Sequence, residues 1–152
     1  MASPDAASWA ADHGYTNVFA FRGGLPEWIQ AGYESVSVEK LPKVDIPAVT
    51  ATDLEKLLAS GQAFVLLDIR PAMEAAKLWI ESGSRLALPF EDLEARFGEI
   101  PKGKKIVLLD VNGKRSPVAG RYLALKGYEN LSRLDGGMNI WVSEGKAFKK
   151  GK

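Results

Sequence analysis

The stretch "KKIVLLDVNGKRSPVAG", residues 104–120, carries the clearest fold signal in this chain. It begins with a nearly continuous apolar run, which is typical of a strand buried on both faces. Asp110 stands at the exit of that run, and a short loop containing Gly113 follows it. Ser116 and Pro117 then open a predicted helix, because serine can cap a helix and proline fits its first turn. A strand, a glycine loop and a helix in this order predict a loop that presents chemistry at a strand end.

Similar patterns extend on the N-terminal side of this stretch. The apolar run at residues 63–70, "AFVLLDIR", predicts a second fully buried strand. Shorter strands are predicted at residues 46–50 and 85–90, and "TDLE" predicts a capping box that begins with Thr52. Strands that alternate with helices indicate an α/β fold with a parallel sheet and helices on both faces. Asp68 then falls at a strand end, and we expect it to pair with Arg70 or with local amides.

An internal repeat is the second strong signal, because residues 3–32 match residues 116–145 at a constant offset of 113. Eleven of the thirty positions are identical. They are Ser3/Ser116, Pro4/Pro117, Ala6/Ala119, Ala11/Ala124, Gly14/Gly127, Tyr15/Tyr128, Asn17/Asn130, Gly23/Gly136, Gly24/Gly137, Trp28/Trp141 and Gly32/Gly145. Each copy predicts a helix, a short strand, a Gly-Gly turn and a second helix. The predicted strands are residues 17–21 and 130–134.

Only the second copy is preceded by the strands that would complete a sheet. We therefore predict three parts: residues 1–33 as the C-terminal part of a truncated repeat, residues 34–45 as a linker, and residues 46–148 as a complete domain. The large apolar side chains of the first part must pack against another surface, and its predicted strand would leave an unpaired edge. We expect a protein partner or a homodimer that forms through this partial repeat.

Composition excludes several classes of function. The chain has 152 residues, no cysteine and a single histidine, His13, which excludes disulfides and multi-histidine or thiolate metal sites within it. A net charge of +1 gives no general attraction to nucleic acid. No apolar run approaches the roughly 20 residues of a membrane helix, so no membrane association is expected. The first residues lack a signal-peptide pattern, which favours a cytoplasmic location. Lysines at positions 146, 149, 150 and 152 predict a solvated tail.

Residues 49–148 resemble the rhodanese-like domain, and the stretch "GYTNVFAFRGGLPEWIQAGY", residues 14–33, resembles the last third of the same family. The stretches that carry the resemblance are "VTATDLEKLLASG", "FVLLDIRPAMEA", "LPFEDLEARFGEIPKGKKIVLLD" and "NGKRSPVAGRYLALKGYENLSRLDGGMNIW". The resemblance implies a parallel five-stranded sheet with helices on both faces, plus an N-terminal helix–strand–helix partial repeat. In active members, a cysteine opens a six-residue loop after the fourth strand and carries a persulfide. Here Asp110 occupies that position.

The candidate binding site is therefore this loop and the first residue after it. It comprises Asp110, Val111, Asn112, Gly113, Lys114, Arg115 and Ser116. Without a cysteine the chain has no thiolate to hold a sulfane sulfur, so no persulfide sulfur transfer is expected. The amides of a glycine loop at a helix N-terminus still favour a small anion. Asp110 either supplies that negative charge itself or points to solvent, with Arg115 as a surface cation.

Three functions follow from these observations. The first is a non-catalytic binding, regulatory or structural module, with no cofactor, metal or catalytic residue. The second is an inactive part of a tandem sulfurtransferase whose catalytic cysteine lies in sequence outside this chain. The third is an aspartate-based phosphotransfer or metal site that uses Asp68 and Asp110, which the Gly-Gly and tryptophan repeat does not favour.

Overall fold

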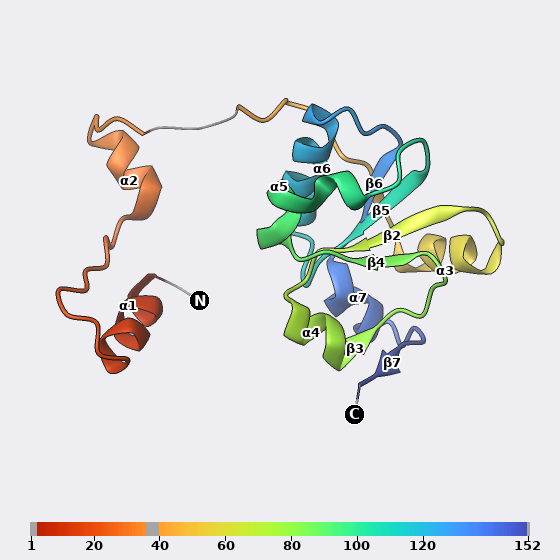
Figure 1. Cartoon of the computed structure of the whole chain (residues 1–152), viewed down its shortest axis with the longest axis horizontal. Helices are drawn as coiled ribbons and strands as arrows, with labels where there is room; N and C mark the ends of the chain where they lie inside the picture. The colour runs from red at the N-terminus through yellow and green to blue at the C-terminus, as the bar shows by residue number, and fades with distance from the viewer. Residues whose placement is uncertain (1–2, 36–39, 152) are drawn as a thin grey trace. The chain divides into compact units, whose positions relative to one another are not determined.

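The computed structural model describes residues 3–35 and 40–151, which belong to two compact units, Met1–Lys40 and Leu41–Lys152 (Figure 1). Residues 36–39 of the predicted linker and Lys152 of the predicted tail lie outside the described residues. None of the helices in the described part of the chain has the length and apolar character needed to cross a bilayer.

The larger unit is built on a parallel five-stranded sheet, so the predicted α/β class is confirmed. The strands are β1 (Ala48–Val49), β2 (Phe64–Asp68), β4 (Arg85–Ala87), β5 (Lys105–Leu109) and β6 (Leu131–Leu134), in the order β1-β6-β5-β2-β4. The central strands β2 and β5 pair from Phe64 with Lys105 to Asp68 with Leu109. This register brings the two strand ends that precede Arg70 and Asp110 to the same edge of the sheet.

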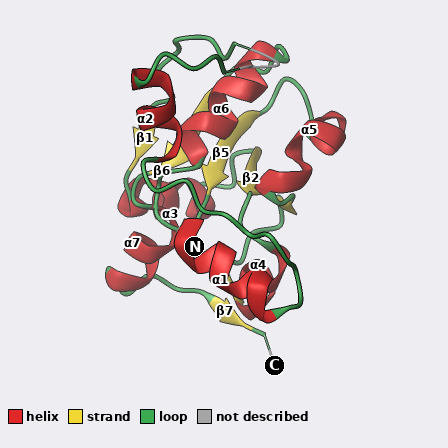
Figure 2. Ribbon diagram, turned by 90° about the vertical axis from the view of Figure 1, so that its left-hand side faces the viewer, coloured by secondary structure: helices red, strands yellow, loops and turns green. Residues whose placement is uncertain are grey.

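Helices cover both faces of this sheet (Figure 2). They are α3 (Ala51–Ala59), α4 (Ala72–Lys77), α5 (Leu93–Arg96), α6 (Ser116–Leu125) and α7 (Gly137–Ser143), with short 3-10 turns η1 (Phe90–Asp92) and η2 (Phe97–Glu99) flanking α5. Side chains alternate along β2, so Val65 and Leu67 pack with residues of α5 and α6, whereas Phe64 and Leu66 pack with residues of α3 and α7. Two apolar layers therefore hold the strand ends in place.

One local prediction for this unit, the helix cap, is wrong, and the lysine tail is exposed as predicted at Lys149 and Lys150 but is not frayed there. Helix α3 is capped by Thr50, whose hydroxyl accepts a hydrogen bond from the Asp53 amide at 3.1 Å, and Thr52 lies inside the helix. The lysine tail is partly ordered, because β7 (Lys149–Lys150) pairs antiparallel with β3 (Leu78–Trp79). β7 consists of two lysines and so lacks the alternating or apolar pattern that predicts a strand from sequence.

The smaller unit contains α1 (Ser3–Asp12) and α2 (Gly24–Gln30), which correspond position for position to α6 and α7 of the larger unit. The local geometry of the two segments also matches. Asn17 and Asn130 both have positive φ, at 58° and 53°. The indole of Trp28 donates to the Glu34 carbonyl at 2.9 Å, and Trp141 donates to a carbonyl at the same spacing and distance. The sequence repeat is therefore also a repeat of local backbone structure.

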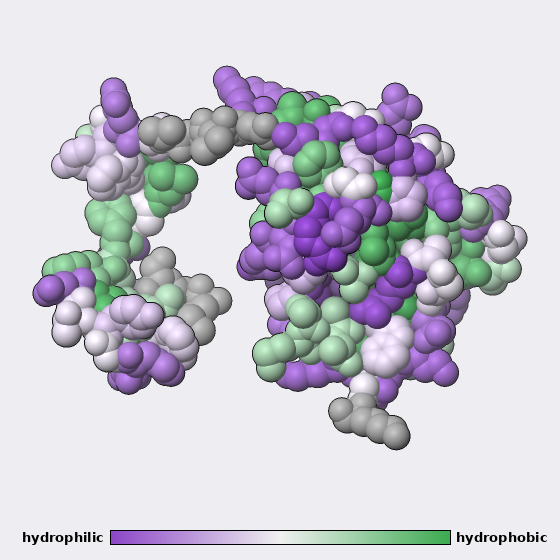
Figure 3. Space-filling view, viewed as in Figure 1, coloured by the Kyte–Doolittle hydropathy of each residue, from purple (hydrophilic) through white to green (hydrophobic). Residues whose placement is uncertain are grey.

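The two segments differ in their strand and in their burial. The strand predicted at residues 17–21 is wrong, because the described residues of Met1–Lys40 contain no strand. Its counterpart β6 has β5 on one side and β1 on the other, and a strand forms only with such neighbours. Trp141 is 2% exposed, whereas Trp28 is 39% exposed. Figure 3 shows hydrophobic side chains at the surface of the smaller unit.

Candidate functional site: the Asp110 loop and the Asp68 cluster

Asp110 follows β5 directly and turns its carboxylate back into the loop. Three backbone amides donate to it: Gly113 at 2.7 Å to Oδ1, and Arg115 at 2.7 Å and Ser116 at 3.0 Å to Oδ2. The residue is 2% exposed, so the alternative in which Asp110 points to solvent is wrong. Gly113 has a φ of 79°, a left-handed conformation that glycine adopts without a steric cost and that turns its amide toward the carboxylate.

The same carboxylate caps the N-terminus of α6. The first amides of a helix have no partner within the helix, and a negative group there is favourable. Ser116 is the first helical residue and makes no capping hydrogen bond through its side chain, so the predicted serine cap is wrong for this helix. Its hydroxyl oxygen is fully buried and has no hydrogen-bond partner in the described part of the chain. The Asp110 carboxylate, which lies outside the helix, therefore caps it by accepting hydrogen bonds from the Arg115 and Ser116 amides.

The Gly-Gly turn before α7 closes the loop from the other side. The Asp110 carbonyl accepts a hydrogen bond from the Met138 amide at 2.8 Å, and the Val111 carbonyl accepts one from Asn139 at 3.0 Å. A Cβ on Gly137 would lie 2.7 Å from Asp110 Oδ1, which leaves room only for glycine. The sequence marked Gly136 and Gly137 as a turn but did not reveal this contact. The presence of this glycine pair in both copies of the repeat was the only indication in the sequence that the turn needs glycine.

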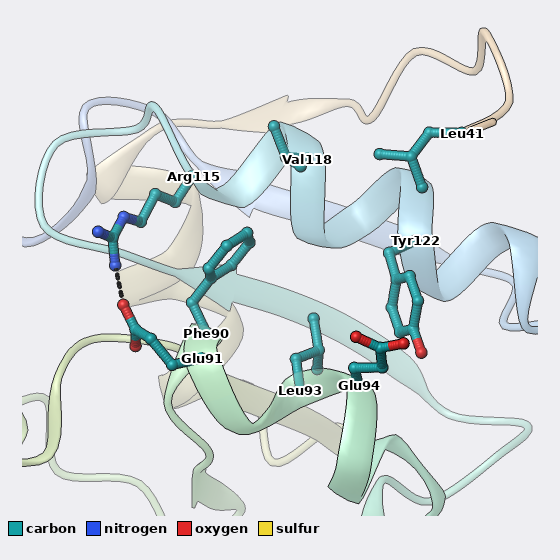
Figure 4. Close-up of a pocket in the computed structure, with 8 residues that line it drawn as sticks. All are labelled: Leu41, Phe90, Glu91, Leu93, Glu94, Arg115, Val118 and Tyr122. Atoms are coloured by element: carbon teal, nitrogen blue, oxygen red, sulfur yellow. Dashed lines mark hydrogen bonds and ion pairs between the residues drawn. The ribbon is translucent and has the colours of Figure 1, made fainter. Parts of the chain in front are cut away.

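Neither cation of the loop forms an ion pair with the Asp110 carboxylate in the described part of the chain. Lys114 is exposed, and the Arg115 guanidinium forms an ion pair of 2.6 Å with Glu91 beside the Phe90 ring (Figure 4). A hydrogen bond from the backbone amide of Glu91, followed by the interaction with Arg115, lowers the pKa of the Glu91 carboxyl below its usual value. The pair lies at one end of a cavity of about 410 Å³ whose wall includes Tyr122. The negative charge at the loop is therefore neutralised by amides rather than by side chains.

Asp68, at the end of β2, forms a second buried polar cluster. Its carboxylate accepts hydrogen bonds from Arg70 Nε at 2.8 Å and Nη2 at 2.7 Å, and from Arg85 Nη2 at 2.9 Å. Asp68 is fully buried and Arg70 is 2% exposed. The arginines also donate to the carbonyls of Leu78 and Ala75, both at 2.9 Å. Arg85 was not identified from the sequence, because it reaches Asp68 only through the pairing of β4 with β2.

Both aspartates are thus fully engaged by groups of the chain itself. Asp68 is held by two guanidinium groups and Asp110 by three amides. Within residues 3–35 and 40–151, no three potential ligands of the types His, Cys, Asp and Glu come close enough to hold a metal ion. The geometry at this edge of the sheet favours a fixed, hydrogen-bonded loop over a reactive carboxylate pair.

Comparison with known proteins gives the same fold. The family model described as "Rhodanese-like domain" matches residues 50–144. A sulfurtransferase of Allochromatium vinosum is 33% identical over 97 residues, covering 64% of this chain and 89% of that protein. The adenylyltransferase and sulfurtransferase MOCS3-2 of Zea mays is 30% identical over 112 residues, covering 70% of this chain but only 23% of that protein.

A solved structure shows the same relationship in three dimensions. The Alr3790 protein of Anabaena sp. superimposes with a TM-score of 0.60 and 27% identity, covering 68% of this chain and 80% of that chain. Because the family model spans more than half of the residues, the chain belongs to the rhodanese-like domain family.

Proposed function

We propose that this chain is a non-catalytic rhodanese-like protein that serves as a binding or regulatory module. The backbone amides of Gly113, Arg115 and Ser116 form an anion-binding site, here called the cradle, and the Asp110 carboxylate occupies it. The observation that carries the proposal is the set of three amide hydrogen bonds to the Asp110 carboxylate. Backbone amides that converge at a helix N-terminus form an anion site. An internal carboxylate is held there at a high effective concentration, so it excludes a free anion from the same position.

The absence of cysteine supports the non-catalytic part of this proposal. Sulfur transfer in this family's active members needs a thiolate that forms and releases a persulfide, and no residue of this chain supplies one. A carboxylate oxygen is not a polarisable sulfur nucleophile. The sulfurtransferase names of the relatives therefore describe those proteins, and for this chain we propose that the fold is kept for binding.

Replacing Asp110 with alanine should open the cradle to an external anion. The amides of Gly113, Arg115 and Ser116 lose their acceptor, and we expect the variant to lose about 1–3 kcal/mol of stability. Sulfate should then shift these three amide resonances in two-dimensional NMR spectra of the full chain. In the wild type, the same resonances should not move at the same sulfate concentration.

The control for this experiment is Glu129→Gln, which removes one negative charge at an exposed position away from the loop. It should leave the three amide resonances as insensitive to sulfate as they are in the wild type. If the loop amides respond equally in the wild type and in Asp110→Ala, or in neither, then the carboxylate does not fill an anion site. Reading individual amides separates this site from any other anion site on the chain.

We further propose that the smaller unit mediates association with a second copy of the chain. Its exposed large apolar side chains are Trp9, Tyr15, Phe19, Phe21, Leu25, Trp28, Ile29 and Tyr33. The rings of Phe21 and Tyr33 lie 5.9 Å and 4.7 Å from Trp28, so part of this surface is already ordered. Identical apolar faces on two copies are suited to an isologous interface. The proposal of a dimer rests on this exposed apolar surface alone, because the described residues of the smaller unit contain no strand edge.

Sedimentation velocity should show a dimer of the wild-type chain at micromolar concentrations. The double variant Phe19→Asp, Trp28→Asp should weaken association by at least about tenfold, since buried aromatic anchors dominate such interfaces. Met73→Asp is the control, because Met73 is an exposed large apolar residue of the larger unit. A strictly monomeric wild type, or equal effects of the two changes, would refute this interface.

A further inference from the structure

Another cavity lies at the same end of the sheet as the Asp110 loop but shares none of the loop residues. It has a volume of about 350 Å³ and lies between α4, β4 and α5. Three arginines line it, Arg70, Arg85 and Arg96, and the rest of its wall is mainly alanine and proline. The alanine side chains leave space beside the guanidinium groups, and the Trp79 ring centroid lies 5.8 Å from the Arg85 Cζ.

The hydrogen bonds of Arg70 and Arg85 leave donors unused. Both side chains bond through Nε and Nη2, to Asp68 and to backbone carbonyls. Neither Nη1 group makes a hydrogen bond within the described part of the chain. Ser116 Oγ is the one fully buried side-chain polar atom without a partner there, so neither Nη1 group is completely enclosed. Arg70 is nevertheless 2% exposed, which makes it a nearly buried cation with free donors at a cavity wall.

The charge around the cavity is also unbalanced. Asp68 balances only one of the two guanidinium groups that it contacts, so the inner group of Arg70, Arg85 and Asp68 carries one positive charge in excess. Asp68 is shared by two arginines, and Asp92 is about half exposed and stands 3.6 Å from Arg96. Glu99 also pairs with Arg96, at 2.7 Å, so Arg96 at the exposed rim is balanced by these two carboxylates and the excess charge belongs to the inner arginines. A nearly buried excess of positive charge favours an anion.

We propose that this arginine cavity binds a small tetrahedral oxyanion such as sulfate or inorganic phosphate. The free Nη1 groups of Arg70 and Arg85 donate to its oxygens, and Arg96 adds a cation at the rim. Guanidinium groups suit this role because each presents several fixed donors to a multidentate oxyanion. The site is independent of the Asp110 loop, so it is a binding activity beyond the proposed function.

The test is a titration of the full chain with sodium sulfate and with sodium phosphate at constant ionic strength, followed by two-dimensional NMR. Saturable shifts should appear for amides around Arg70, Arg85 and Arg96, and the amides of residues 113–116 should stay unchanged. Arg85→Gln should weaken binding by about tenfold or more, because it removes a charged donor and the excess charge. Arg96→Ala should weaken it by a few-fold.

Arg121→Gln is the matched control, because it removes an exposed arginine of α6 that does not line the cavity, and it should leave the affinity unchanged. Arg96 is exposed and its replacement leaves the buried cluster intact, so this variant tests the site even if Arg85→Gln does not fold. The proposal is refuted if the wild type shows no saturable shifts at the cavity up to tens of millimolar anion, or if Arg96→Ala and Arg121→Gln weaken binding equally. A response confined to residues 113–116 would also refute it, and would contradict the filled Asp110 cradle as well.

Discussion

Asp110→Cys should give this chain thiosulfate:cyanide sulfurtransferase activity that the wild type lacks. The new thiol would stand where the amides of Gly113, Arg115 and Ser116 now hold a carboxylate, at the N-terminus of α6. Those amides and the helix dipole favour a thiolate. The thiolate would attack the outer sulfur of thiosulfate, the sulfur–sulfur bond would break, and sulfite would leave with the electron pair. Cyanide would then remove the sulfur as thiocyanate and restore the thiolate.

Thiocyanate formation measures this gain, and we expect it to exceed the wild-type background by on the order of 10² or more, since losing a nucleophile costs enzymes far more than that. Asp135→Cys is the matched control, because it introduces a single exposed thiol outside the cradle. Asp110→Ser keeps a hydroxyl in the cradle but has no sulfur, and it should be inactive. If Asp110→Cys is folded and alkylated by iodoacetamide yet makes no thiocyanate, then restoring the nucleophile is not sufficient, and the loop no longer has the geometry that sulfur transfer requires.

The sequence predicted the central sheet because its strongest strands are fully apolar. Residues 63–70 and 104–110 became β2 and β5, and their buried side chains form both core layers. The strand predicted at residues 17–21 failed for the opposite reason. It occupies the same position in the repeat as β6, but β6 exists through hydrogen bonds to two neighbouring strands, and the described residues of the smaller unit contain no strand. The helices and turns of the repeat form from local sequence in both segments. The strand forms only where neighbouring strands pair with it.

The site was predictable where it depends on one stretch of chain, and not where it depends on contacts between stretches. The loop of residues 110–116 and its converging amides follow from a strand, a glycine and a helix start. The contact of Gly137 with Asp110 could not be read from the sequence, since it depends on how α7 meets the end of β5. Arg85 was missed for the same reason: it reaches Asp68 only because β4 pairs with β2. Thr50 shows the smaller error of two residues that is typical of helix ends.

Asp68→Asn should cause the largest loss of stability of any single substitution in the polar clusters. The carboxylate is fully buried and balances two guanidinium groups, at 2.7 Å and 2.9 Å. Asparagine keeps the shape but not the charge, so Arg70 would remain nearly buried without a counter-charge. Breaking a buried ion pair from one side costs about 3–5 kcal/mol. Urea unfolding followed by circular dichroism should report this difference in the free energy of unfolding.

The matched control is Glu55→Gln, which breaks the ion pair with Lys146 on the same unit. That pair is as short, at 2.6 Å, but the Glu55 side chain is half exposed, so its loss should cost less than about 1 kcal/mol. The comparison isolates burial, because both changes replace a carboxylate with the corresponding amide. Similar losses in the two variants would mean that solvent already screens Asp68, and that the cluster does not hold the excess positive charge on which the arginine cavity depends.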